Sequence, residues 1–102
     1  MENDDLSQMV FAKINYSGNY FDEHAKVVTL IESFFSDVNS GLQSDSWIWI
    51  MDGDEKVAID TFTSIKHQVK SYTAGLHVQK VIDALHTKYD VEVFDEPVGE
   101  WD

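Results

Sequence analysis

The chain has 102 residues, 43% of them hydrophobic and 13% aromatic, which is enough for one domain that buries a core without metals or crosslinks. It contains no cysteine, and this excludes disulfides, thiolate nucleophiles and cysteine-bound metal sites. Seven lysines and no arginine stand against nineteen acidic residues, for a net charge of -12. Because phosphates would be repelled, we expect no direct binding of nucleic acid.

The ends of the chain and its apolar runs bear on localisation. No apolar run approaches the roughly 18 residues that span a bilayer, and the N-terminus is acidic, so we expect a cytoplasmic protein without a membrane partner. We expect residues 1–7 to form a flexible acidic N-terminus and residues 8–95 a single α+β domain. Residues 96–102 are expected to form an acidic C-terminal tail that carries Trp101.

The first predicted elements are a strand and a helix. Residues 9–16 alternate in polarity, which places Ala12 and Ile14 on one face and Phe11 on the other. Asn19 is a candidate N-cap for a helix with an apolar stripe that reaches Val38. We expect Gly41 to end this helix in a left-handed conformation.

Residues 47–62 read as a β-hairpin, because two runs rich in β-branched and aromatic residues flank Asp52-Gly53. The period of two gives each strand two faces whichever turn length applies. One face is aliphatic and is expected under helices, namely Ile48, Ile50, Val57 and Ile59. The other face is mixed and is expected to be partly open, namely Trp47, Trp49, Met51, Ala58, Asp60 and Phe62.

The rest of the chain gives a less regular pattern. Residues 64–72 fit an edge strand or a helix face, and we favour the strand. Thr73 is then expected to cap a second helix whose apolar stripe faces away from His77. Residues 91–94 are expected to form a short last strand.

These elements predict an α+β fold of the order β-α-β-β-(β)-α-β. We expect a two-layer α/β sandwich, with a mainly antiparallel sheet of four to five strands and two helices on one face, ferredoxin-like in outline. The core should include the aliphatic face of the hairpin together with Ile31, Phe35, Val78, Ile82 and Leu85.

The sequence offers little material for catalysis. It contains no phosphate loop, nucleophile elbow or metalloprotease motif, so we assign no catalytic residue, metal or cofactor and expect a protein that is not an enzyme. His24 is interpreted as a solvated first-turn residue, and His67 as a histidine at the edge of the core. The acids of Asp52-Gly53-Asp54-Glu55 are explained by turn chemistry, because they lack the spacing of a calcium loop.

The remaining feature is an aromatic face in a strongly acidic chain. We hypothesise an interaction protein that binds a basic protein partner, as an inhibitor, an immunity-type protein or a regulator that mimics nucleic-acid charge. The residues assigned to partner binding are Phe11, Trp47, Trp49, Asp52, Asp54, Glu55, Asp60 and Phe62. A homodimer through the open sheet face is also expected. The alternative is a dimeric domain that binds a small molecule in an aromatic-lined pocket.

Overall fold

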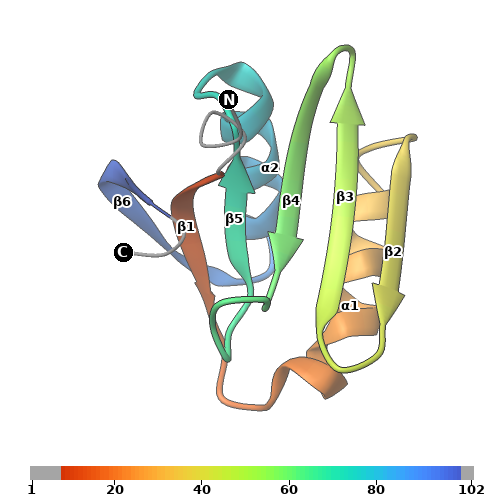
Figure 1. The fold of residues 1–102 in the computed structure, drawn as a ribbon. Helices are drawn as coiled ribbons and strands as arrows, with labels where there is room; N and C mark the ends of the chain where they lie inside the picture. Colours follow the sequence, from red (N-terminus) through yellow and green to blue (C-terminus); the bar gives the residue numbers. More distant parts are fainter. Residues whose placement is uncertain (1–7, 100–102) are drawn as a thin grey trace.

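The computed structural model describes residues 8–99, which form six strands and two helices (Figure 1). In chain order these are β1 (Met9–Asn15), α1 (Tyr20–Glu32), β2 (Val38–Leu42), β3 (Ser46–Asp52), β4 (Glu55–Asp60), β5 (Gln68–Ser71), α2 (Leu76–His86) and β6 (Asp90–Gly99). The predicted flexible N-terminus at residues 1–7 lies outside the described residues, as does Trp101. No helix in the described part of the chain is long and apolar enough to cross a membrane.

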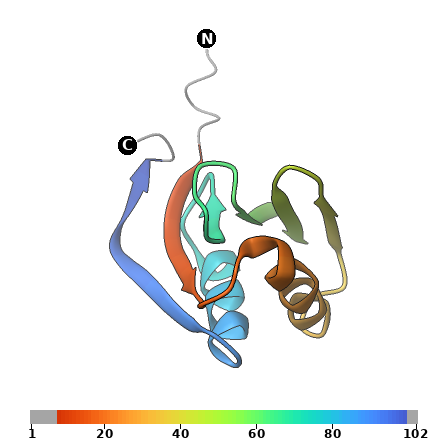
Figure 2. The ribbon, with the colours of Figure 1, turned by 90° about the horizontal axis from the view of Figure 1, so that it is seen from below.

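The six strands make one open antiparallel sheet in the order β2-β3-β4-β5-β1-β6. Both helices lie on the same face, and no helix among residues 8–99 covers the opposite one, which we call the open face (Figure 2). The predicted α+β class and two-layer arrangement are therefore confirmed. The sheet has six strands rather than four or five, so the ferredoxin-like outline is matched only in part.

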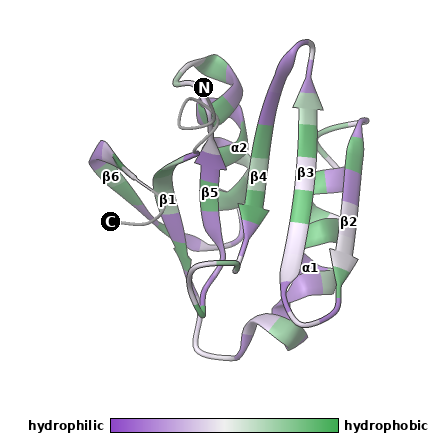
Figure 3. Cartoon of the chain, in the orientation of Figure 1, coloured by the Kyte–Doolittle hydropathy of each residue, from purple (hydrophilic) through white to green (hydrophobic). Residues whose placement is uncertain are grey.

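The core lies between the sheet and the helices, as the hairpin pattern predicts. Ile48, Ile50, Val57 and Ile59 have no exposed surface, and neither have Ile31 and Leu85. Val78 and Ile82 are also buried, whereas Phe35 packs against the core and is only partly buried. Figure 3 shows hydrophobic residues alternating with near-neutral ones along β3, and a continuous hydrophobic stretch in β4.

The first helix begins as predicted and ends earlier. The Asn19 side chain accepts a hydrogen bond from the backbone N–H of Asp22 at 2.9 Å, which caps α1. The helix ends at Glu32, six residues before Val38, because Val38 pairs with Ile50 in the sheet. The expected glycine cap is wrong: Gly41 lies in β2, where a Cβ atom would come within 2.4 Å of the Trp47 ring. Gly41 is needed for this close approach rather than for a turn.

The second helix and the last strand also differ from expectation. Residues 68–71 form β5, which confirms the strand only for the second half of the ambiguous segment. The N-cap of α2 is Gly75 at φ 154°, not Thr73, and His77 is buried rather than pointing away.

The last strand runs to Gly99, so residues 96–99 belong to the sheet and not to a tail. Pro97 is tolerated because β6 is an edge strand.

Candidate functional site

The open face carries an aromatic pair on β3. Trp47 and Trp49 are two residues apart on this strand, and their ring centroids lie 4.4 Å from each other. The Trp47 indole covers Gly41 of β2, while the ammonium of Lys56 lies 4.1 Å from the ring centroid of Trp49. Met51 follows on the same face, in register with Lys56. We call Trp47, Trp49 and Met51 the tryptophan patch.

The tryptophan patch is only partly exposed. Trp49 keeps 37% of its surface exposed, whereas Trp47 and Met51 are half-buried. Phe62 follows the end of β4 and is 48% exposed, but no ring contact joins it to either tryptophan within residues 8–99. The structure therefore brings the two tryptophans together as one apolar anchor and leaves Phe62 as a separate exposed side chain.

Other residues assigned to the site lie elsewhere. Phe11 is in the core, beside α2, because the pairing of β1 shifts register between Val10 and Ala12 and turns Phe11 to the helical side. Asp60 lies on the open face but is 1% exposed, and it pairs with Lys70 at 2.6 Å. A partner cannot contact either residue in this conformation, so the residues assigned to partner binding do not form one accessible surface.

The acids of the β3–β4 turn are partly engaged within the molecule. Asp52 pairs with Lys80 of α2 at 3.1 Å, and Glu55 accepts a hydrogen bond from Thr73 at 2.8 Å. Asp54 is exposed at the tip beside Gly53, whose φ of 65° fits the tight turn predicted there. Of the three acids, Asp54 therefore offers the freest charge to a partner.

A buried polar cluster lies where β1, α1, β3 and the loop before β5 converge. Ser46 places its hydroxyl 2.7 Å from His67 Nε2 and 2.6 Å from His24 Nδ1. The second ring nitrogen of His67, Nδ1, lies 2.7 Å from the Tyr16 hydroxyl. Ser46 and His67 have no exposed surface. We call Tyr16, His24, Ser46 and His67 the serine–histidine cluster.

One assignment of protons gives each hydrogen bond of the serine–histidine cluster a donor and an acceptor. Tyr16 O–H donates to His67 Nδ1, His67 Nε2–H donates to the Ser46 hydroxyl, and this hydroxyl donates to His24 Nδ1. Tyr16 also accepts the backbone N–H of His67 at 3.3 Å. The hydrogen bonds use neutral imidazoles and join four segments of the chain, so the cluster fastens α1 and the loop before β5 to the sheet.

Burial sets the protonation states around this cluster. Desolvation, with His24 nearby, lowers the pKa of His67 to about 4, and desolvation also lowers the pKa of His24. Desolvation raises the pKa of Tyr16. Burial, together with a hydrogen bond to Glu23, raises the pKa of Tyr89. Such a group of shifted pKa values is typical of active sites, but the buried Ser46 hydroxyl is out of reach of a substrate here.

Sequence reasoning missed this cluster. It placed His67 at the edge of the core, whereas the side chain is fully buried, and it interpreted His24 as solvated, whereas this half-buried ring contacts Ser46. The pairs Tyr16–His67 and Ser46–His67 are 51 and 21 residues apart in sequence, so no local motif announces them. The only sequence signal is the alternation of His67 with Val69, which places the histidine on an inward-facing position.

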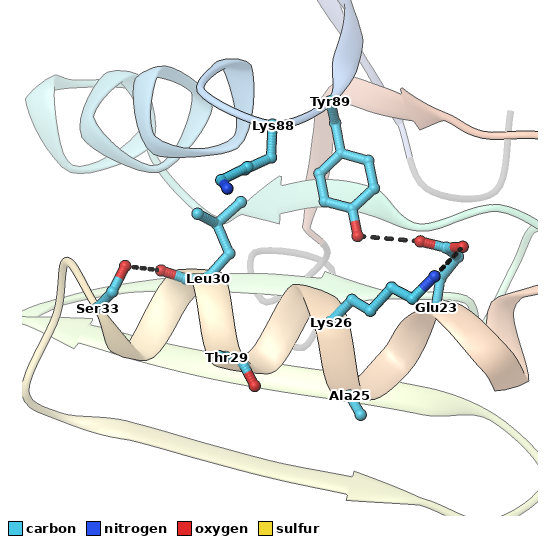
Figure 4. A pocket seen from close by; sticks show the side chains of 8 residues that line it. All are labelled: Glu23, Ala25, Lys26, Thr29, Leu30, Ser33, Lys88 and Tyr89. Atoms are coloured by element: carbon cyan, nitrogen blue, oxygen red, sulfur yellow. Dashed lines mark hydrogen bonds and ion pairs between the residues drawn. The ribbon is translucent and has the colours of Figure 1, made fainter.

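A groove of about 750 Å³ lies on the helical side, between α1 and the turn from α2 to β6 (Figure 4). Glu23 and Lys26 form an ion pair at 3.7 Å on one wall, and Tyr89 donates a hydrogen bond to Glu23 at 3.0 Å. Leu30 and Lys88 also line the groove. Within residues 8–99, no three histidine or acidic side chains are arranged to hold a metal ion.

The fold and these sites define the class of protein as an α+β domain with an open antiparallel sheet and an aromatic surface. Comparison with protein-family models, with curated proteins and with solved structures gave no match.

Proposed function

We propose that this chain is a non-enzymatic interaction protein that binds a basic protein partner through the tryptophan patch. The observation that supports it is the tilted pair of Trp47 and Trp49, partly exposed on a sheet face that no helix within residues 8–99 covers, in a chain of net charge -12. Tryptophan is enriched among the residues that dominate binding energy at protein interfaces.

The electrostatics of the patch favour cationic side chains. Lys56 already lies over the Trp49 ring, which is the geometry of a cation–π contact. The net negative charge steers basic molecules toward the surface and raises their association rate. Exposed Asp54 lies on the turn that continues β3, so a partner lysine or arginine has a carboxylate near the apolar anchor.

Substitution of Trp49 by lysine tests this function. We expect Trp49→Lys to fold like the wild type and to lose most of the partner binding, because it removes the exposed anchor and adds a repelling charge. Ile65→Lys is a matched control, since Ile65 is a 78% exposed apolar residue in the loop before β5. The measurement is affinity capture from a lysate at low and high salt, with identification of the bound proteins.

The capture experiment has two outcomes that contradict the proposal. One is that the wild type retains no basic protein at either salt concentration. The other is that Trp49→Lys and the wild type retain the same basic proteins. Loss of binding in Trp49→Lys but not in Ile65→Lys supports the patch as the binding site.

The groove on the helical side favours a second candidate function, the binding of a small molecule. Its volume of about 750 Å³ lies within the usual range of ligand pockets, and it combines the apolar Leu30 with two lysines and a tyrosine. This site differs from the aromatic pocket expected from the sequence, because no tryptophan among the described residues lines it. Ligand binding there would be unaffected by Trp49→Lys, which separates the two functions.

A further inference from the structure

The two edges of the sheet are protected to different degrees. Natural proteins protect exposed edges with charged residues, proline or bulges, because unpaired backbone groups attract other strands. Edge strand β6 carries four acids and Pro97, and its partner β1 shifts register between Val10 and Ala12. Edge strand β2 reads Val-Asn-Ser-Gly-Leu, with no charge, no proline and an unbroken register against β3.

The backbone of β2 presents a row of hydrogen-bonding groups outward. Met51 N–H donates to the carbonyl of Asp37 at 3.0 Å, and Gln43 N–H donates to Asp45 at 3.1 Å. Because backbone groups alternate in direction along a strand, Asn39 and Gly41 also turn toward β3. The residues whose backbone N–H and C=O groups point away from β3 are Val38, Ser40 and Leu42. β2 is last in the strand order, and Figure 1 shows no element beyond it.

We propose that β2 pairs antiparallel with β2 of a second copy of this chain, about a two-fold axis at Ser40. In this register Ser40 lies opposite itself and Val38 lies opposite Leu42 of the second copy. The outward groups of these three residues then form about six backbone hydrogen bonds, two for each hydrogen-bonded pair. The contact is isologous, since the same surface is used by both copies, and it closes after two chains.

The composition of β2 favours a second copy over a basic peptide. A basic segment would find its opposite charges on β6, where Asp95 and Glu96 are exposed, and not on the uncharged β2. In the proposed register, apolar Val38 meets apolar Leu42, and Asp37 meets Gln43 of the second copy. No two carboxylates face each other across the axis, so two acidic chains can approach at this edge.

This pairing gives the two tryptophan patches a defined arrangement. Trp49 is in register with Asn39, and Trp47 is in register with Gly41. Asn39 would lie opposite Gly41 of the second copy. Four residues are then aligned across neighbouring strands of the joined sheet: Trp49 and Asn39 of one chain, followed by Gly41 and Trp47 of the other. Three strand spacings of about 4.8 Å separate them by about 14 Å. Both patches stay exposed on one continuous face, unlike in a dimer made by stacking open faces.

The association is expected to be concentration-dependent and favoured by salt. A five-residue strand buries less than the roughly 1,200 Å² of a typical stable interface, so the dimer forms only at high protein concentration. The charges of -12 on each copy repel, and salt screens that repulsion. Sedimentation of the wild type should therefore show more dimer as protein and salt concentrations rise.

A single engineered cysteine tests the register, since the chain contains none. Hydrogen-bonded residues across antiparallel strands have Cα atoms about 5.5 Å apart, within the range that a disulfide bridges. Ser40→Cys should therefore form a disulfide-linked dimer under oxidised glutathione. Ser17→Cys, at an exposed serine in the turn after β1, is the matched control. We expect Ser40→Cys to cross-link about tenfold faster or more, because pairing holds the two thiols at high effective concentration.

Equal cross-linking rates for Ser40→Cys and Ser17→Cys would overturn the proposal. A second pair of variants addresses the same edge without oxidation. Ser40→Lys places two ammonium groups opposite each other at the axis and should leave a folded monomer, whereas Ser17→Lys should dimerise like the wild type. A dimer that persists in Ser40→Lys, or a wild type that stays monomeric at the highest soluble concentration, would also overturn it. Neither result bears on partner capture by the tryptophan patch.

Discussion

At the scale of single residues, the stability of the molecule depends on polar groups that are buried and fully bonded. His67 has no exposed surface and contacts both Tyr16 and Ser46. Protonation of its ring would place a charge in a desolvated site beside His24, and this is why the pKa of His67 is lowered to about 4. Protonation would also remove the acceptor nitrogen that Tyr16 uses. The cluster holds only while this ring is neutral.

The pKa of His67 predicts how stability depends on pH. Between its unfolded value near 6.5 and its folded value of about 4, the unfolded chain binds a proton that the folded chain does not. Stability is therefore complete above this window and falls as the pH decreases through it, by about 1.4 kcal/mol for each unit. His67→Gln should be less stable at pH 7 and should lose less stability between pH 6.5 and 4. Urea unfolding at several pH values measures how the free energy of unfolding changes with pH in the wild type and in His67→Gln. Equal pH dependence in the two proteins would contradict the lowered pKa of His67.

At the scale of elements, the β3–β4 hairpin divides the molecule into a covered and an open face. Ile59 is fully buried under the helices, whereas Met51 is half-buried on the open face of the same hairpin. The register pairs Ile48 with Ile59 and Trp49 with Ala58, so the two faces never mix along these strands. Both helices pack on the aliphatic face, and this leaves the tryptophans on the other.

This division predicts unequal costs for two truncations in one hairpin. Ile59→Ala should lower the free energy of unfolding by about 2–5 kcal/mol, because it removes buried methylene groups and leaves a cavity. Met51→Ala should cost less, since Met51 is already partly in contact with solvent. Chemical denaturation of the two variants provides the comparison. An equal or larger cost for Met51→Ala would mean that the open face is packed like the core.

At the scale of the whole molecule, charge is the dominant feature. Seven lysines stand against nineteen acids, which leaves an excess of twelve negative charges. Lys70 pairs with Asp60 inside the fold, and Lys13 pairs with Glu92 on the surface. Because the remaining acids repel one another, the folded state carries an electrostatic strain that a basic partner would relieve.

The excess of acid predicts that salt stabilises the folded chain. Between about 0.01 M and 0.1 M NaCl, the Debye length falls from about 30 Å to about 10 Å, which screens repulsion across the surface. The thermal midpoint should rise over this range. Glu96 is an exposed acid on β6. The thermal midpoint of Glu96→Lys should rise less over the same range of salt, because one repulsive charge has been reversed. No change in the wild-type midpoint would show that the surface charges are too well separated to matter.

The sequence by itself determined what depends on neighbouring residues. The period of two in residues 47–62 fixed which side chains face the helices, and Asn19 and Gly53 marked a helix start and a turn, because each acts within a few residues of itself. The tertiary structure decided what depends on distant partners. Residues 38–42 became a strand because β3 lies beside them, Asp60 is buried and paired with Lys70, and Ser46 meets two histidines that lie 22 and 21 residues away. Such contacts leave no local pattern, since folding alone brings these groups together.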